Sequence, residues 1–296
     1  MNRNASFLTL AMLGLVGLLW GLNWPSVKVL LGAIAPFTLR AAAFTCAAVV
    51  LSAVAWALGL RMRPAPGEGR ALFWTGAFVL FGFNMFTAFG QLLTPASSAA
   101  IIAYTMPAMT AGLSIVWLGE RQDARRLSAI GLGIAGLAVL ASSDFGALVA
   151  APLGPLLMFA AAFSWAIGNV LMKVHRWTLP ALSRAAWIFI VSAALAWPLA
   201  LVFQPQEAGP WPSLPVLLIF AFHVGGPLVT CYLLWTILLG RLSATVAAIS
   251  TLIAPVVGVL SSALLLDESL TWQKLVALAL IVLSILLIAI APRQPS

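Results

Sequence analysis

Two stretches of the sequence decide the fold, because each holds the same residues in the same order inside a long apolar run. Residues 20–40 are WGLNWPSVKVLLGAIAPFTLR, and residues 165–184 are WAIGNVLMKVHRWTLPALSR. Chance seldom repeats four such residues in order, so we expect an internal repeat. The matched pairs, at offsets of 145 residues for the first two and 144 for the last two, are Trp20 and Trp165, Lys28 and Lys173, Pro36 and Pro180, and Arg40 and Arg184.

A second match lies downstream and needs no gap. At an offset of 148 residues it pairs 99–101 with 247–249, Pro107 with Pro255, Ser114 with Ser262, Glu120 with Glu268, and Leu127 with Leu275. The Ala and Leu identities carry little weight in an apolar sequence, whereas the Pro and Glu pairs carry more. Together the matches predict two repeats, over residues 8–143 and 153–291, that share one core.

The composition places the chain in a membrane. Charged residues make up 7% of its 296 residues, hydrophobic residues make up 63%, and the mean hydropathy is +1.10. Soluble domains carry about 25% charged residues, which they need to cover their surface. These values exclude cytosolic enzymes, disordered regulators and disulfide-stapled secreted modules. Cys46 and Cys231 lie within apolar runs, so we expect neither a disulfide nor a metal site, and no cofactor.

The long apolar runs predict an all-α integral membrane protein of ten transmembrane helices. A helical span needs about 20 apolar residues, and the runs lack the alternation of a membrane β-barrel. Each repeat would hold five spans. The predicted spans are 6–27, 36–60, 70–92, 95–118, 125–143, 153–175, 180–203, 213–238, 242–266 and 271–291.

The Lys and Arg residues in the connections predict the orientation. Twelve fall on the side of the N-terminus and three, Lys28, Arg40 and Lys274, on the other. Because cytoplasmic loops are enriched in Lys and Arg, both termini are expected in the cytoplasm. This bias also accounts for the net charge of +8, so nucleic acid is not an expected partner. Five spans per repeat make the second repeat inverted, which is typical of transporters.

Three further features resemble a known family: the run Trp20-Gly-Leu-Asn23, the run Gly119-Glu-Arg121, and the central prolines Pro107 and Pro255. The chain resembles the drug/metabolite transporter superfamily, EamA type, and within it the bacterial aromatic amino acid exporters. The resemblance implies a cavity formed mainly by spans 1, 3, 4, 6, 8 and 9, with spans 5 and 10 peripheral. Two positions depart from the pattern in the second half: 267–269 is Asp-Glu-Ser, and Asn23 aligns with Gly168, one place before Asn169.

The candidate substrate-binding residues are polar and aromatic side chains inside the spans. Intramembrane amides can hold the amino or carboxylate group of a substrate, and aromatic rings offer an apolar wall. The alternatives are that Asn side chains link helices and that Trp side chains belong to interfacial belts, as expected for Trp117, Trp177, Trp211 and Trp272. The candidates are Trp20, Asn23, Trp24, Asn84, Tyr104, Trp165, Asn169, His223 and Tyr232.

Prolines and basic residues within the spans suggest moving parts and anchors. Pro107, Pro255 and Pro227 each remove a backbone donor, so we expect a kink at each, which serves either gating or shape alone. Lys28, Arg40, Lys173 and Arg184 lie near span ends, and their charged groups are expected to reach the membrane interface.

The acidic residues bear on energy coupling. All seven fall in connections or at span ends, which leaves His223 as the one ionisable group near the membrane centre apart from the basic residues. A proton-driven carrier usually needs an ionisable group within the membrane. Transport is therefore expected to proceed without a buried-carboxylate proton relay, by facilitated diffusion or exchange, with proton coupling through His223 as the alternative.

These observations predict a transporter in the bacterial inner membrane. We expect it to export small hydrophobic metabolites, with aromatic amino acids favoured by the resemblance, through alternating access. Export of other amino acids, drugs or metabolites remains open. A membrane-embedded enzyme is less favoured because the sequence lacks a catalytic cluster, and the chain is not expected to be an enzyme. The expected partners are a small-molecule substrate and the lipid bilayer, and the chain is expected to act as a monomer.

Overall fold

The computed structural model describes residues 3–119, 124–142, 149–204, 212–234 and 244–290. Every regular element within these ranges is helical. In chain order the elements are α1 (Arg3–Leu31), α2 (Pro36–Ala57), α3 (Glu68–Gly76), η1 (Ala77–Gly82), α4 (Phe83–Leu93), α5 (Ala96–Ala103), α6 (Met106–Leu118), α7 (Ala124–Ser142), α9 (Leu153–Val174), α10 (Ala181–Phe203), α11 (Leu214–His223), η2 (Val224–Thr230), α13 (Ala244–Leu266) and α14 (Trp272–Ile290).

These helices occupy the ten predicted spans, so the all-α membrane fold class is confirmed. In the described residues, seven segments are long and apolar enough to cross a membrane, and three shorter apolar helices complete the set. Three spans are composite. The third consists of α3, η1 and α4, the fourth of α5 and α6, and the eighth includes α11 and η2, where η1 and η2 are π-helical segments.

The outer surface of the bundle is apolar. Large hydrophobic side chains on the outside include Trp56, Val116 and Leu264, which are 75–81% exposed. Soluble proteins rarely expose apolar area so continuously, and a bilayer is the environment in which such a surface is stable. The surface therefore supports the membrane assignment independently of the hydropathy of the sequence.

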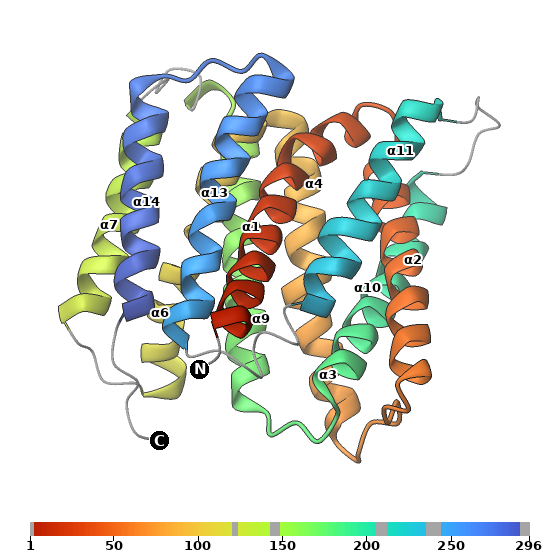
Figure 1. Cartoon of the computed structure of the whole chain (residues 1–296). Coiled ribbons are helices and arrows are strands. Elements are labelled where there is room, and N and C mark those ends of the chain that lie inside the picture. Colours follow the sequence, from red (N-terminus) through yellow and green to blue (C-terminus); the bar gives the residue numbers. More distant parts are fainter. Residues whose placement is uncertain (1–2, 120–123, 143–148, 205–211, 235–243, 291–296) are drawn as a thin grey trace.

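The helices form one bundle with two clear edges (Figure 1). Helices α7 and α14 lie side by side at one edge, and α2 packs against α10 at the other. Between them, α1 packs along α13, and α9 packs against α4, α5 and α6. The peripheral place of spans 5 and 10 agrees with the expectation from the resemblance. Helix α1 begins and α14 ends at the same end of the bundle, as an even number of spans requires.

The helix contacts correspond when the first five spans are exchanged for the last five. The contact of α1 with α13 has its counterpart in α9 with α5 and α6, and the contact of α13 with α14 has its counterpart in α6 with α7. The contact of α2 with α10 joins corresponding spans of the two halves, and so does the contact of α7 with α14, so the exchange leaves both contacts unchanged. An inverted repeat would produce this pattern.

Side chains from distant segments accept hydrogen bonds from backbone N–H groups in the first turn of two helices and just before a third. Gln204 Oε1 accepts from the backbone N–H groups of Phe37 and Thr38 at the start of α2 (2.9 and 3.2 Å). At the opposite end of the same helix pair, Glu68 Oε1 accepts from Thr178 and Leu179 just before α10. Glu268 accepts from Ala96 and Ser97 at the start of α5. First-turn N–H groups lack partners within their own helix, so these caps join the ends of the bundle.

One glycine permits a close helix contact in the middle of the bundle. A Cβ atom at Gly168 of α9 would lie 2.5 Å from the backbone nitrogen of Val79 in η1 and 2.7 Å from its Cα. Backbone atoms cannot rotate away, so a larger residue must push the two segments apart. The close contact leaves no room for a side chain at Gly168, the position that aligns with Asn23 of the first repeat. The asparagine of the second repeat, Asn169, stands one place later.

We expect Gly168→Ala to lower the melting temperature of the detergent-solubilised protein by roughly 5 °C. Overpacking costs about 1–3 kcal/mol, and each kcal/mol shifts the midpoint by about 2–4 °C in a chain of this size. The control is Gly131→Ala in α7, where an added Cβ meets no atom within 4 Å. Equal melting temperatures for the two variants, measured by intrinsic fluorescence, would contradict the close contact.

Candidate functional site

A small polar cavity lies among α1, α2 and α4. Its volume is about 30 Å³, enough for about one water molecule. Three of its residues, Asn23, Trp24 and Asn84, are among those predicted from the sequence. The full lining is Asn23, Trp24, Val27, Arg40, Phe83, Asn84, Thr87 and Gln91.

A chain of hydrogen bonds runs through one wall of this cavity. Arg40 Nη1 lies 3.4 Å from Nε2 of His223, and Nδ1 of the same ring lies 2.6 Å from Oδ1 of Asn23. A guanidinium has only donors, so Nε2 accepts and Nδ1–H donates to Asn23. The imidazole is therefore in its neutral form, because a second ring proton would face the positive charge of Arg40. His223 and Arg40 are both fully buried, at 0% and 1% exposure.

The prediction that Arg40 reaches the membrane interface is wrong. Gln204 caps the half-buried first turn of α2, and the Arg40 guanidinium turns inward to His223. Lys28 is half-buried near the end of α1, and its Nζ donates to the backbone carbonyls of Gln91 and Thr94 at the end of α4. A cation at a helix C-terminus satisfies carbonyls that have no partner in the helix.

Several buried polar atoms near the cavity have no protein partner. Both amide atoms of Gln91 and Nε of Arg40 are buried without a hydrogen bond, and so is Oγ1 of the neighbouring Thr94. Buried polar groups are normally paired, and each one left unpaired costs free energy. Gln91 and Arg40 both line the cavity, so this space contains unused donors and acceptors for a bound molecule.

Aromatic rings continue the apolar side of the cavity. Trp24 packs on Tyr104 with ring centroids 6.0 Å apart, and Phe83 packs edge-on against Trp165 at 4.9 Å. Trp24 and Phe83 line the cavity itself. The predicted residues Tyr104 and Trp165 stand behind these two rings and fix their positions.

Three other predicted residues lie away from the cavity lining. Trp20 donates from Nε1 to the carbonyl of Pro227 (3.2 Å) and packs edge-on against Tyr232. Tyr232 in turn packs against Phe189 of α10. Asn169 donates to the carbonyl of Trp165 one turn earlier in its own helix. Asn84 makes the same kind of bond, to Leu80, but faces the cavity.

The predicted prolines interrupt their helices unequally. The fourth span breaks at Tyr104 and Thr105, and Pro107 stands in the first turn of α6 after the break. Pro227 lies within η2, where the wider π turn accommodates the missing donor. Pro255 sits inside α13, which continues through it as a helix. A proline removes one hydrogen bond and a long helix can absorb this by bending.

The π segment η1 has neighbours that satisfy its carbonyls. Ser164 Oγ of α9 donates to the carbonyl of Phe78 (2.7 Å), and Ser192 Oγ of α10 donates to that of Gly76 (3.3 Å). The third and eighth spans, which correspond in the predicted repeat, thus both contain π turns beside the cavity helices. The sequence predicted neither π segment, although Gly225-Gly226-Pro227 marks the second as irregular. Such turns are frequent at functional sites.

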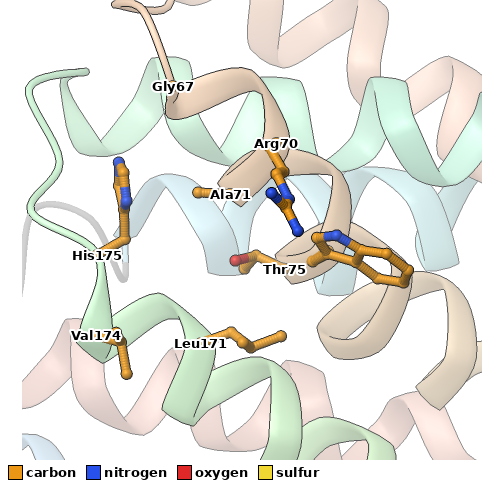
Figure 2. Close-up of a pocket in the computed structure, with 8 residues that line it drawn as sticks. Gly67, Arg70, Ala71, Thr75, Leu171, Val174 and His175 are labelled. Atoms are coloured by element: carbon orange, nitrogen blue, oxygen red, sulfur yellow. The ribbon is translucent and has the colours of Figure 1, made fainter.

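A second, larger cavity lies between α3 and the end of α9 (Figure 2). Its volume is about 250 Å³, and Arg70, Thr75, Leu171 and His175 are among its lining residues. Figure 1 places α3 at the end of the bundle where α1 begins and α14 ends, which is the side of the twelve basic residues. The sequence does not reveal this cavity, because none of its lining residues belongs to a polar cluster within a span.

Within the described ranges, no group of three His, Cys, Asp or Glu side chains is positioned to hold a metal ion. The polar groups instead surround a space among membrane helices, which suits the reversible binding of a small molecule. Fold and site together define a membrane transporter.

Comparison with known proteins identifies the family. Residues 8–142 and 152–290 each match the EamA-like transporter family, and the chain belongs to this family. It is 30% identical over 279 residues to a probable amino-acid metabolite efflux pump of Escherichia coli (strain K12), covering 90% of both proteins. It is 27% identical over 122 residues to a probable terminal-alkyne amino-acid exporter of Streptantibioticus cattleyicolor, covering 41% of both. A crystal structure 24% identical in sequence shares the fold, with a TM-score of 0.68 over 94% of this chain and 96% of the other.

Proposed function

We propose that this transporter exports amino acids and small metabolites derived from them, with aromatic amino acids as favoured substrates, across the inner membrane of a bacterium. The observation that carries this proposal is the cavity, which combines a guanidinium and amides on one side with aromatic rings on the other. An aromatic amino acid has the same division between a polar head and an apolar ring. Two relatives whose names refer to amino-acid export support the same substrate class.

Alternating access is the proposed mechanism. Two inverted five-helix repeats, over residues 8–143 and 153–291, would give the cavity two related shapes that open to opposite sides. The exchangeable helix contacts support this arrangement. The break at Tyr104 and Thr105 and the two π segments are the places where the bundle would bend, because regular helix bonding is already interrupted there. Both termini lie in the cytoplasm in this scheme, and the monomer is the transporting unit.

Substrate movement would not depend on a buried carboxylate. In the described residues, Glu68, Asp267 and Glu268 lie at a helix start or in a connection, and two of them cap helices. These three carboxylates are not part of the cavity lining. The expected driving force is therefore the substrate gradient, through facilitated diffusion or exchange.

Counterflow into liposomes tests the proposed function. Liposomes containing the purified protein would be loaded with unlabelled phenylalanine and diluted into a trace of labelled phenylalanine, tyrosine or tryptophan. We expect transient accumulation of each label above that in protein-free liposomes, and stronger competition from leucine than from aspartate. If no amino acid exchanges above the protein-free level, the proposed function is wrong; exchange of leucine alone would limit the error to the aromatic preference.

A further inference from the structure

We propose that Arg40 and Gln91 form a carboxylate-binding subsite, so that the transporter selects substrates with a free carboxylate. This inference rests on the proposed export of amino acids and identifies the group that the polar side of the cavity recognises. It assigns a binding role to Arg40, a residue that was expected at the membrane interface.

The first argument is the charge of Arg40. The guanidinium is buried, and its described partner is the neutral imidazole of His223. Among the residues that the structure describes, no carboxylate forms a salt bridge with it. A buried charge is normally paired with an opposite charge, because removing it from water is costly. An anionic ligand would supply this missing charge.

The second argument comes from the matching arginine in the other half of the chain. Arg40 and Arg184 each stand four residues after the proline that precedes or begins their helix, α2 or α10. Glu68 accepts from Thr178 and Leu179 just before α10 and interacts electrostatically with Arg184. At the corresponding end of α2 the cap is the neutral Gln204. Among the described residues, Arg184 therefore has a carboxylate nearby, whereas the equivalent Arg40, beside the cavity, has none.

The third argument is the set of unused hydrogen-bonding atoms. Nε of Arg40 and both amide atoms of Gln91 are buried and unpartnered, and both residues line the same cavity as Asn23 and Asn84. A carboxylate has two oxygens that accept from a guanidinium and an amide N–H at once. A neutral carboxamide offers a single uncharged acceptor oxygen, and a cationic head group is repelled by Arg40.

The size of the cavity shows which part of the substrate it fits in this conformation. About 30 Å³ accommodates a small polar group but not a whole amino acid. The aromatic ring of a substrate would lie against Trp24 and Phe83, which must separate when the cavity opens. The carboxylate would stay at Arg40, because the guanidinium is held on its far side by His223.

The test compares L-phenylalanine with L-phenylalaninamide, which lacks the carboxylate, in the counterflow assay. Wild-type protein is expected to exchange the acid at least ten times faster than the amide. Arg40→Gln should lower exchange of the acid about 100-fold and bring the ratio close to one, while Arg40→Lys should keep an intermediate ratio. The matched control is Arg184→Gln, which should keep the wild-type ratio even if its total rate falls.

A second variant covers the case in which Arg40→Gln does not fold. Gln91→Leu keeps the charge and should raise the apparent KM for phenylalanine about tenfold without a matching change for the amide. An Arg40→Gln protein, or a Gln91→Leu protein if the first is unstable, that keeps the wild-type preference for the acid would overturn the subsite. This outcome differs from failure of the proposed function, in which the wild-type protein exchanges neither compound.

Discussion

Glu68→Ala is expected to lower the melting temperature of the solubilised protein by roughly 10 °C. The carboxylate of Glu68 is buried and accepts four hydrogen bonds, from the backbone N–H groups of Ala65, Thr178 and Leu179 and from the hydroxyl of Thr178. Each bond to a charged acceptor contributes about 1.5–3 kcal/mol. Of the residues that supply the donors, Leu179 is buried and would keep an N–H group without a partner, whereas Thr178 is exposed and can turn to water. A net loss of about 3–5 kcal/mol corresponds to this shift at about 2–4 °C per kcal/mol.

The same substitution is expected to loosen one particular end of the bundle. Glu68 joins the connection after α2 to the start of α10, so hydrogen exchange of the amides at 178–182 should rise before that of the bundle centre. The matched control is Asp267→Asn, because Asp267 is exposed and its positive φ of 52° suits Asn as well. A Glu68→Ala protein that melts within 2 °C of the wild type would contradict the capping role.

His223→Leu is expected to lower counterflow at least tenfold, whereas His223→Gln should keep most of it. The ring of His223 supplies one acceptor to Arg40 and one donor to Asn23. A Gln side chain supplies both, through its carbonyl oxygen and its NH2 group, but it cannot take up a proton. Leu supplies neither, so the buried Arg40 guanidinium would lose its hydrogen bond to position 223. Leaving this buried donor unpaired costs about 1–3 kcal/mol or more of folding free energy.

The pair of variants also distinguishes two forms of energy coupling. If His223 only positions Arg40, the transport rate of His223→Gln should follow the wild-type rate between pH 6 and pH 8. If instead the imidazole carries a proton, His223→Gln should lose uphill transport in a pH gradient while keeping exchange. Measurement of both rates in the same proteoliposomes decides between a positioning residue and a proton carrier.

Hydropathy and repeated residues were sufficient to predict the overall fold. A bilayer allows few solutions to a long apolar run, so the ten spans followed from length and charge, and the peripheral place of spans 5 and 10 followed from the resemblance. Helix interruptions were harder to predict. Pro107 and Pro255 match in the sequence, yet only the fourth span breaks, since a break also depends on the turn at Tyr104 and Thr105.

The cavity was only partly predictable. Asn23, Trp24 and Asn84 were found because polar or aromatic residues within a span are conspicuous. Arg40 was misplaced because its distance from the span end, four residues, suggested an interfacial position. Its inward direction depends on the packing of α2 against α10 and on the acceptor at His223, which is 183 residues away in the sequence. Gln91 was missed for the same reason, since its burial is a property of the assembled bundle.

The measurement that tests this account most directly is an experimental structure with bound L-phenylalanine. The account predicts that the carboxylate of the ligand lies within hydrogen-bonding distance of the Arg40 guanidinium and that its ring contacts Trp24 and Phe83. A ligand bound instead in the cavity between α3 and α9, beside Arg70 and His175 and without contact to Arg40, would contradict it.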